Sequence, residues 1–230
     1  MFGDRVFSKF LDVWKCRNML QPKIVEKNWV ESYNEWARGR DQYLTFLVRV
    51  KDDSMVKRIA EIQNKLSTNP CVDPFPKEYL HITVKGCGFL AESERFEDDI
   101  SRENSERIIS QAKETLQTHS EFDVFLSKLN ILPEVVLVEI HDKGRIGVIN
   151  RELQSIQEIR KMDYDYPRFL PHISISQFKS QQEFNELVSQ LERLRNTEFG
   201  ELTVNSIELV SANLSRKYPT LKTIHSFKLK

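Results

Sequence analysis

The chain has 230 residues, and its 34 lysines and arginines are balanced by 34 aspartates and glutamates. This length suits one large domain or two closely packed lobes, and it allows a sizeable core to be buried without disulfides. The 40% apolar and 30% charged composition excludes a disordered tail and a collagen-like rod. A formal net charge of zero excludes the uniformly basic surface of a protein that coats nucleic acid, but not a small basic patch in a cleft.

The cysteines and the apolar segments indicate the compartment. The three cysteines, Cys16, Cys71 and Cys87, are odd in number and widely spaced, which is typical of a reduced intracellular protein. The sequence has no apolar run long enough for a membrane span, and charges interrupt the apolar residues near the N-terminus, unlike in a signal peptide. We therefore expect a cytoplasmic or nucleoplasmic protein with no membrane partner.

Residues 1–40 predict a helical extension that precedes the main domain, residues 41–230. Two amphipathic helices are expected, one on each side of Pro22, which cannot lie inside a helix. Their apolar faces carry Phe2, Val6, Phe10, Leu11 and Trp14 in the first and Trp29, Val30, Tyr33, Trp36 and Ala37 in the second. Such faces usually dock on the protein's own core, so we expect docking here, with recruitment of a protein partner as the alternative.

Strands and helices alternate from residue 43 onward. Strands are predicted over residues 43–50, 80–85, 122–132, 135–140, 171–178, 202–210 and 223–229. The helices between them carry apolar residues on one face, and they are expected to include Met55 to Leu66, Ile108 to Leu116, Ile146 to Ile159 and Phe184 to Leu194. Asp53 or Ser54 is the expected cap of the first of these helices, and the acidic stretch 92–99 is expected to be a solvated loop.

The second half of this pattern resembles the first. His81 lies 31 residues after Val50, the end of one predicted strand, and His172 lies 32 residues after Ile140, the end of another. A helix is predicted in each interval, so the two histidines lie in equivalent strands. The sequence therefore predicts an α+β, bilobal chain: two similar β-sheet lobes with flanking helices, plus the N-terminal helical extension.

Each of these two strands carries a short motif, H-I-T-V starting at His81 and H-I-S-I starting at His172. Because strand side chains alternate between faces, His81, Thr83 and Lys85 are expected on one face of their strand. His172 and Ser174 are expected on the corresponding face of the second strand. If the lobes pack side by side, both imidazoles and both hydroxyls line one cleft.

This set of side chains suits acid–base chemistry at phosphorus. Two imidazoles with pKa values near neutrality can serve as base and acid on opposite sides of one reacting centre. Hydroxyl groups and a lysine can hold the oxygens of a phosphate. Two histidines without a carboxylate or thiolate nearby are too few for zinc, so no metal is expected. The other histidines, His119, His141 and His225, lack this motif and are interpreted as surface or structural residues.

Paired H-x-[ST] motifs in a bilobal α+β chain resemble the two-histidine (2H) phosphoesterase superfamily, in particular its 2′-5′ RNA ligase-like and cyclic phosphodiesterase branch. The resemblance rests on H-I-T-V-K from His81 and F-L-P-H-I-S-I from Phe169, and it covers the chain from the first predicted strand onward. It implies a LigT-like fold and a metal-independent phosphodiesterase without cofactors, acting on 2′,3′-cyclic phosphates, 2′-5′ linkages or oligonucleotide ends. It also implies catalytic roles for His81 and His172, and phosphate binding by Thr83 and Ser174.

Further contacts and partners are expected around the motifs. Lys85 would contact the phosphate, and Tyr79 and Tyr166 flank the motifs and could stack on a base. The expected partners are RNA ends, short oligonucleotides or cyclic nucleotides, bound by a monomer. The alternative is a nucleotide- or RNA-binding module that uses the same cleft without turnover, although binding alone would not require a matched acid–base pair.

Overall fold

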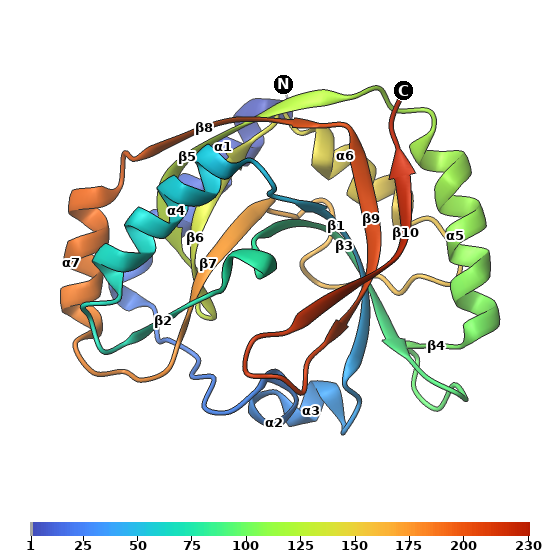
Figure 1. The fold of residues 1–230 in the computed structure, drawn as a ribbon, viewed down its shortest axis with the longest axis horizontal. Coiled ribbons are helices and arrows are strands. Elements are labelled where there is room, and N and C mark those ends of the chain that lie inside the picture. Colours follow the sequence, from blue (N-terminus) through green and yellow to red (C-terminus); the bar gives the residue numbers. More distant parts are fainter. Residues whose placement is uncertain (1) are drawn as a thin grey trace.

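A computed structural model describes the backbone of residues 2–230 and the side chains from Ser8 onward (Figure 1). Within these residues the strands are β1 (Gln42–Arg49), β2 (Val72–Pro74), β3 (His81–Leu90), β4 (Asp99–Ile100), β5 (Phe122–Ile131), β6 (Val135–His141), β7 (His172–Phe178), β8 (Glu198–Val204), β9 (Ser206–Asn213) and β10 (Thr220–Lys228). The helices are α1 (Phe2–Lys15), α2 (Trp29–Ser32), α3 (Asn34–Ala37), α4 (Asp53–Leu66), α5 (Arg102–Leu116), α6 (Arg145–Leu153) and α7 (Phe184–Leu194), with short 3-10 helices η1 (Arg17–Met19) and η2 (Lys77–Tyr79). Phe2 and Val6, which are expected on an apolar helix face, have side chains outside the described residues. In the described part of the chain, no helix combines the length and apolarity that crossing a membrane requires.

The strands of the described residues belong to one sheet, in which two lobes meet. One lobe has the strand order β10-β9-β1-β3 and the other β7-β6-β5-β8, while the short strands β4 and β2 add to β3 and β7. Ile82 of β3 faces Ile173 of β7 in an antiparallel pair, and both side chains are fully buried. The predicted α+β class with two similar lobes is confirmed, with the addition that the lobes form one continuous curled sheet.

Helices α4 and α6 each cross from one lobe to the other. α4 follows β1 but packs against β7 and β8, and α6 follows β6 but packs against β3. Their buried faces, which include Ile59 on α4 and Ile149 on α6, join the same hydrophobic core as Ile82 and Ile173. The two lobes therefore share one core instead of burying two separate ones. Figure 1 shows α7 and α5 at opposite sides of the molecule, each flanking one lobe.

Several boundaries differ from the predicted ones, and the second predicted N-terminal helix is the two short helices α2 and α3. The predicted strand 202–210 is two strands, because the chain crosses at Asn205 from β8 in one lobe to β9 in the other. The cap of α4 is Asp52, whose carboxylate accepts a hydrogen bond from the backbone N–H of Met55 at 2.8 Å. α6 ends at Leu153, earlier than predicted, and the isoleucines that follow it reach the core from turns.

The N-terminal segment docks on the sheet, as its apolar faces predict. α1 packs against β5 and β6, where Phe10 is fully buried in a cluster with Leu137. Trp29 of α2 contacts this cluster and also a second cluster, which contains Tyr43 of β1 and Phe89 of β3. The segment therefore contacts both lobes.

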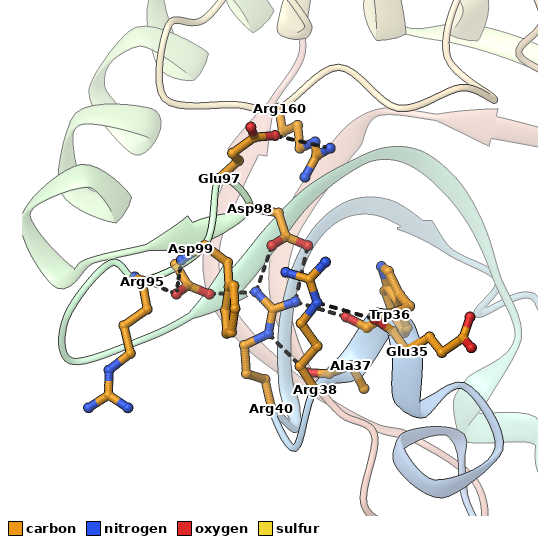
Figure 2. A network of polar contacts seen from close by, with 11 residues as sticks. Glu35, Trp36, Ala37, Arg38, Arg40, Arg95, Glu97, Asp98, Asp99 and Arg160 are labelled. Carbon is orange, nitrogen blue, oxygen red and sulfur yellow. Dashed lines mark hydrogen bonds and ion pairs between the residues drawn. The ribbon is translucent and has the colours of Figure 1, made fainter.

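Arg40 connects this segment to the loop between β3 and β4 (Figure 2). Its guanidinium donates to both carboxylate oxygens of Asp98, at 2.6 and 3.2 Å, and to Asp99 at 2.5 Å. It also donates to the backbone carbonyl oxygens of Trp36 and Ala37, so each nitrogen of the guanidinium has an acceptor. Asp98 and Asp99 lie in the stretch predicted to be a solvated loop, but both are buried around this arginine.

Replacing Arg40 with alanine should lower the free energy of unfolding by about 3–5 kcal/mol, because the buried carboxylates of Asp98 and Asp99 would lose the cation that balances their charge. Arg107→Ala is the matched control, since its ion pair with Glu103 is exposed and should contribute less than about 1 kcal/mol. Chemical denaturation of both variants measures the difference. Equal stability of the two variants would contradict the role assigned to Arg40.

Candidate functional site

His81 and His172 lie at the first positions of β3 and β7, next to the isoleucine pair that joins the lobes. The antiparallel direction of this pair puts His81 on the same side of it as Ser174, and Thr83 on the same side as His172. All four side chains are half-buried, whereas the isoleucine inside each motif is fully buried. The structure thus brings the two motifs together on one face of the sheet.

Backbone carbonyl groups orient both imidazoles in the same way. The Nδ1 of His81 lies 2.5 Å from the carbonyl oxygen of Tyr79, and the Nδ1 of His172 lies 2.8 Å from that of Leu170. A carbonyl oxygen can only accept, so each Nδ1 donates, and in the neutral ring the proton is on Nδ1. The Nε2 lone pair of each ring is then left for proton transfer.

Burial lowers the pKa of both histidines. The pKa of His81 falls to about 4: burial is the main cause, the hydrogen bond to Tyr79 opposes it, and the positive charges of His172 and Arg49 add to it. The pKa of His172 is also lowered, again mainly by burial. Both rings are therefore mostly neutral at pH 7 in the free protein, and a bound anion would favour their protonation.

Tyr79 packs against His81. Its ring meets the imidazole edge-on, with centroids 4.8 Å apart, and it also packs on Phe75 at 4.4 Å. Tyr166 lies in the loop before β7, where its ring lies 5.4 Å from the guanidinium of Arg151. A role for either tyrosine in binding a base stays a prediction.

The prediction that Lys85 contacts the phosphate is wrong. Its side chain is fully buried, forms an ion pair with Asp165 at 2.8 Å and donates to the carbonyl oxygen of Arg160 at 2.9 Å. The cause is a β-bulge in β3. Two consecutive residues of β1 face Thr83 and Lys85, which leaves Val84 between them as an extra residue. The alternation of side chains between the two faces of β3 therefore ends at this bulge. Lys85 therefore anchors the loop that precedes β7.

Arg49 is a cation at the site that the motifs do not reveal. It faces His81 across β1 and β3, so the two side chains share a face of the sheet. Its guanidinium donates to the carboxylate of Glu208 at 2.8 Å and to the hydroxyl of Thr223 at 3.3 Å, which hold it in place. The alternation of side chains along β1 places Arg49 on the face opposite the core residues of that strand. The register between β1 and β3 then places it beside His81.

The N-terminal segment covers the corresponding face of the other lobe. Leu137 of β6 faces Ser174 of β7, and it is buried in a cluster with Phe10 of α1. Asn130 of β5 donates to the backbone carbonyl of Phe10 at 2.9 Å, and the ammonium of Lys9 donates to backbone carbonyl oxygens of the loop that leads into β7. The N-terminal segment thus covers the sheet on the side of β5 and β6.

The other histidines have neighbours of their own. Each pairs with or packs against a nearby side chain: His119 with Glu152, His141 with Phe10 and His225 with Phe227. In the part of the chain that the structure describes, no three His, Cys, Asp or Glu side chains are grouped as metal ligands would be. Independence from metal ions stays a prediction.

A family model matches the sequence, and solved structures share the fold. The family model of the 2′-5′ RNA ligase superfamily matches residues 51–216. The protein TT0787 of Thermus thermophilus has 19% sequence identity and a TM-score of 0.61, with 81% of this chain and 97% of that chain covered. E. coli LigT in complex with 3′-AMP has 14% identity and a TM-score of 0.60, with 83% and 99% covered. LigT in complex with NADP+ has 16% identity and a TM-score of 0.60, with 82% and 98% covered. Because the matched segment includes both H-x-[ST] motifs and most of the sheet, the chain belongs to the 2′-5′ RNA ligase superfamily, among the 2H phosphoesterases.

Proposed function

We propose that this protein is a metal-independent phosphodiesterase that acts on RNA-type phosphodiesters, namely 2′,3′-cyclic phosphates, 2′-5′ linkages or oligonucleotide ends. The observation that carries the proposal is the antiparallel pair of Ile82 with Ile173, which joins the two strands that begin with His81 and His172. Membership of the 2′-5′ RNA ligase superfamily supports this chemistry. Nucleotide-type substrates are supported by the LigT structures, which are complexes with 3′-AMP, NADP+ and ATP.

In the proposed reaction, the phosphate lies between the two imidazoles. One Nε2 removes a proton from the attacking water or ribose hydroxyl, while the other donates a proton to the leaving oxygen. Thr83 and Ser174 donate hydrogen bonds to the non-bridging oxygens, whose charge grows in the transition state. Arg49 faces His81 across β1 and β3, and its positive charge favours the neutral form of that imidazole.

Alanine at either histidine should slow the hydrolysis of a nucleoside 2′,3′-cyclic phosphate by ~10²-fold or more, since each variant loses one proton-transfer group. His225→Ala is the matched control, because its imidazole packs against Phe227 on β10, and it should keep the wild-type kcat/KM. Chromatography of the product measures the rates, and circular dichroism confirms folding. Wild-type rates in folded His81→Ala and His172→Ala would rule out the paired role.

The lowered pKa values predict an acidic optimum for kcat/KM. The reaction needs one neutral and one protonated imidazole. This state of the pair is most populated at a pH between its two pKa values. Both pKa values are lowered from 6.5, and that of His81 is about 4. We expect kcat/KM to peak below pH 6.5 and to fall as the pH rises, because the proton of the acid is lost. The profile of kcat should lie at higher pH, since the bound phosphate favours protonation. A kcat/KM that keeps rising through pH 8 would contradict this.

A binding module without turnover is the second candidate. It is favoured by the neutral state of both imidazoles at pH 7, which leaves the free protein without a protonated acid. Tight binding of a nucleoside 2′-phosphate, with no turnover of cyclic phosphates or 2′-5′ linkages between pH 5 and 8, would favour it over the phosphodiesterase.

A further inference from the structure

The strands on either side of the two motifs place one cation beside them. The residues that face the histidines and hydroxyl residues of the motifs are Leu47 and Arg49 on β1, and Leu137 and Glu139 on β6. Both leucines are fully buried. The carboxylate of Glu139 is also fully buried, and it accepts hydrogen bonds from Asn130 at 2.8 Å and from Arg195. Of these four positions, Arg49 alone has a cationic side chain, and it faces His81.

The guanidinium of Arg49 is fixed by part of its donors and keeps the rest for a ligand. Its Nε donates to the carboxylate of Glu208 at 2.8 Å, and its Nη2 donates to the backbone carbonyl oxygen of Leu221 at 3.0 Å and to the hydroxyl of Thr223 at 3.3 Å. Among the residues that the structure describes, none accepts a hydrogen bond from Nη1, and this nitrogen is not buried. The side chain is 18% exposed, so Nη1 can donate to a bound group while the other bonds stay in place.

The ion pair with Glu208 does not remove the positive charge beside His81. Glu208 also pairs with Lys51 at 2.9 Å, so two cations share this carboxylate. Burial raises the pKa of Glu208, but hydrogen bonds from Arg49, Thr223 and Lys51 outweigh it and lower the pKa to about 2, so the carboxylate is ionised at neutral pH. Glu208 therefore holds the guanidinium in one orientation and offsets only part of the charge of the two cations.

A phosphate at the motifs lies within reach of this guanidinium. Facing residues of neighbouring antiparallel strands have Cβ atoms about 5 Å apart, and an arginine side chain is long enough to span that distance. The charge of Arg49 also acts on the imidazole: burial is the main cause that lowers the pKa of His81, and Arg49 adds to it. Arg49 is therefore placed to contact the group on which His81 acts.

We propose that Arg49 is a further catalytic residue, whose Nη1 binds one non-bridging oxygen of the reacting phosphate. This inference rests on the proposed phosphodiesterase function and deepens it. The oxygen gains negative charge in the transition state, so a charge-assisted hydrogen bond to it strengthens there. Because Glu208 and Leu221 fix the guanidinium before the substrate binds, little side-chain freedom is lost on binding. Proton transfer remains with the histidines, since the guanidinium stays protonated.

Replacing one non-bridging oxygen with sulfur tests for a direct contact. The two diastereomers of uridine 2′,3′-cyclic phosphorothioate carry the sulfur on opposite sides of the phosphate, and sulfur accepts hydrogen bonds only weakly. The wild type should therefore prefer one diastereomer, and Arg49→Gln should lose most of this preference. Arg49→Gln should also lower kcat/KM for uridine 2′,3′-cyclic phosphate by about tenfold or more, the usual effect of losing one hydrogen bond to a charged group.

Lys51→Gln is the matched control, because it removes a cation from the same carboxylate. Its side chain is 73% exposed and lies beyond the residues of β1 that pair with β3. This variant should keep the wild-type kcat/KM and the wild-type preference between the diastereomers. Arg49→Lys keeps the positive charge but not the planar group with several donors, so it should lose the preference as Arg49→Gln does.

The outcomes separate Arg49 from the reaction. An unchanged preference in folded Arg49→Gln or Arg49→Lys, or equal losses in Arg49→Gln and Lys51→Gln, would overturn the contact and leave the phosphodiesterase standing. No hydrolysis of uridine 2′,3′-cyclic phosphate by the wild type would contradict the phosphodiesterase. Calorimetric titration with uridine 2′-phosphate then decides on Arg49: the contact predicts about tenfold weaker binding by Arg49→Gln than by Lys51→Gln, and equal dissociation constants would overturn it.

Discussion

The pairing of Ile82 with Ile173 is the constraint on which the rest of the structure depends, because it joins the lobes and sets the register of the two motifs. Beyond this pair β3 and β7 diverge, and their backbone carbonyl groups need other donors. Two crossing helices supply them. Gln63 of α4 donates to the carbonyl oxygen of Ile175 at 2.7 Å, and Asn150 of α6 donates to that of Val84 at 2.8 Å. Each helix that crosses between the lobes thus stabilises the strand next to the site.

The sheet is nearly symmetric about this pair, but the site is not. The N-terminal segment packs on β5 and β6 and, through Trp29, on both lobes, whereas the face of β1 beside the site carries Arg49. The positive charge therefore acts on one histidine more than on the other. The two motifs have the same pattern, but the charges around their imidazoles differ. A reaction with one acid and one base requires such a difference.

The sequence was sufficient where the structure follows from local rules. Alternation along a strand places His81 and Thr83 on one face, and it holds up to the bulge. The burial of Lys85 and the position of Arg49 beside His81 depend on the register between β1 and β3, which no local pattern encodes. The division of the predicted strand 202–210 was missed because Asn205, where the chain crosses between lobes, has no glycine or proline beside it.

The most direct test of the account is the state of the two imidazoles, measured by ¹⁵N NMR of the histidine side chains. The account predicts that His81 and His172 are both Nδ1–H tautomers near pH 7.5, and that their signals change together when a nucleoside 2′-phosphate binds, while those of His119 and His225 do not. An Nε2–H tautomer at either histidine, or a response confined to one of them, would contradict the claim that both rings present Nε2 to a single phosphate.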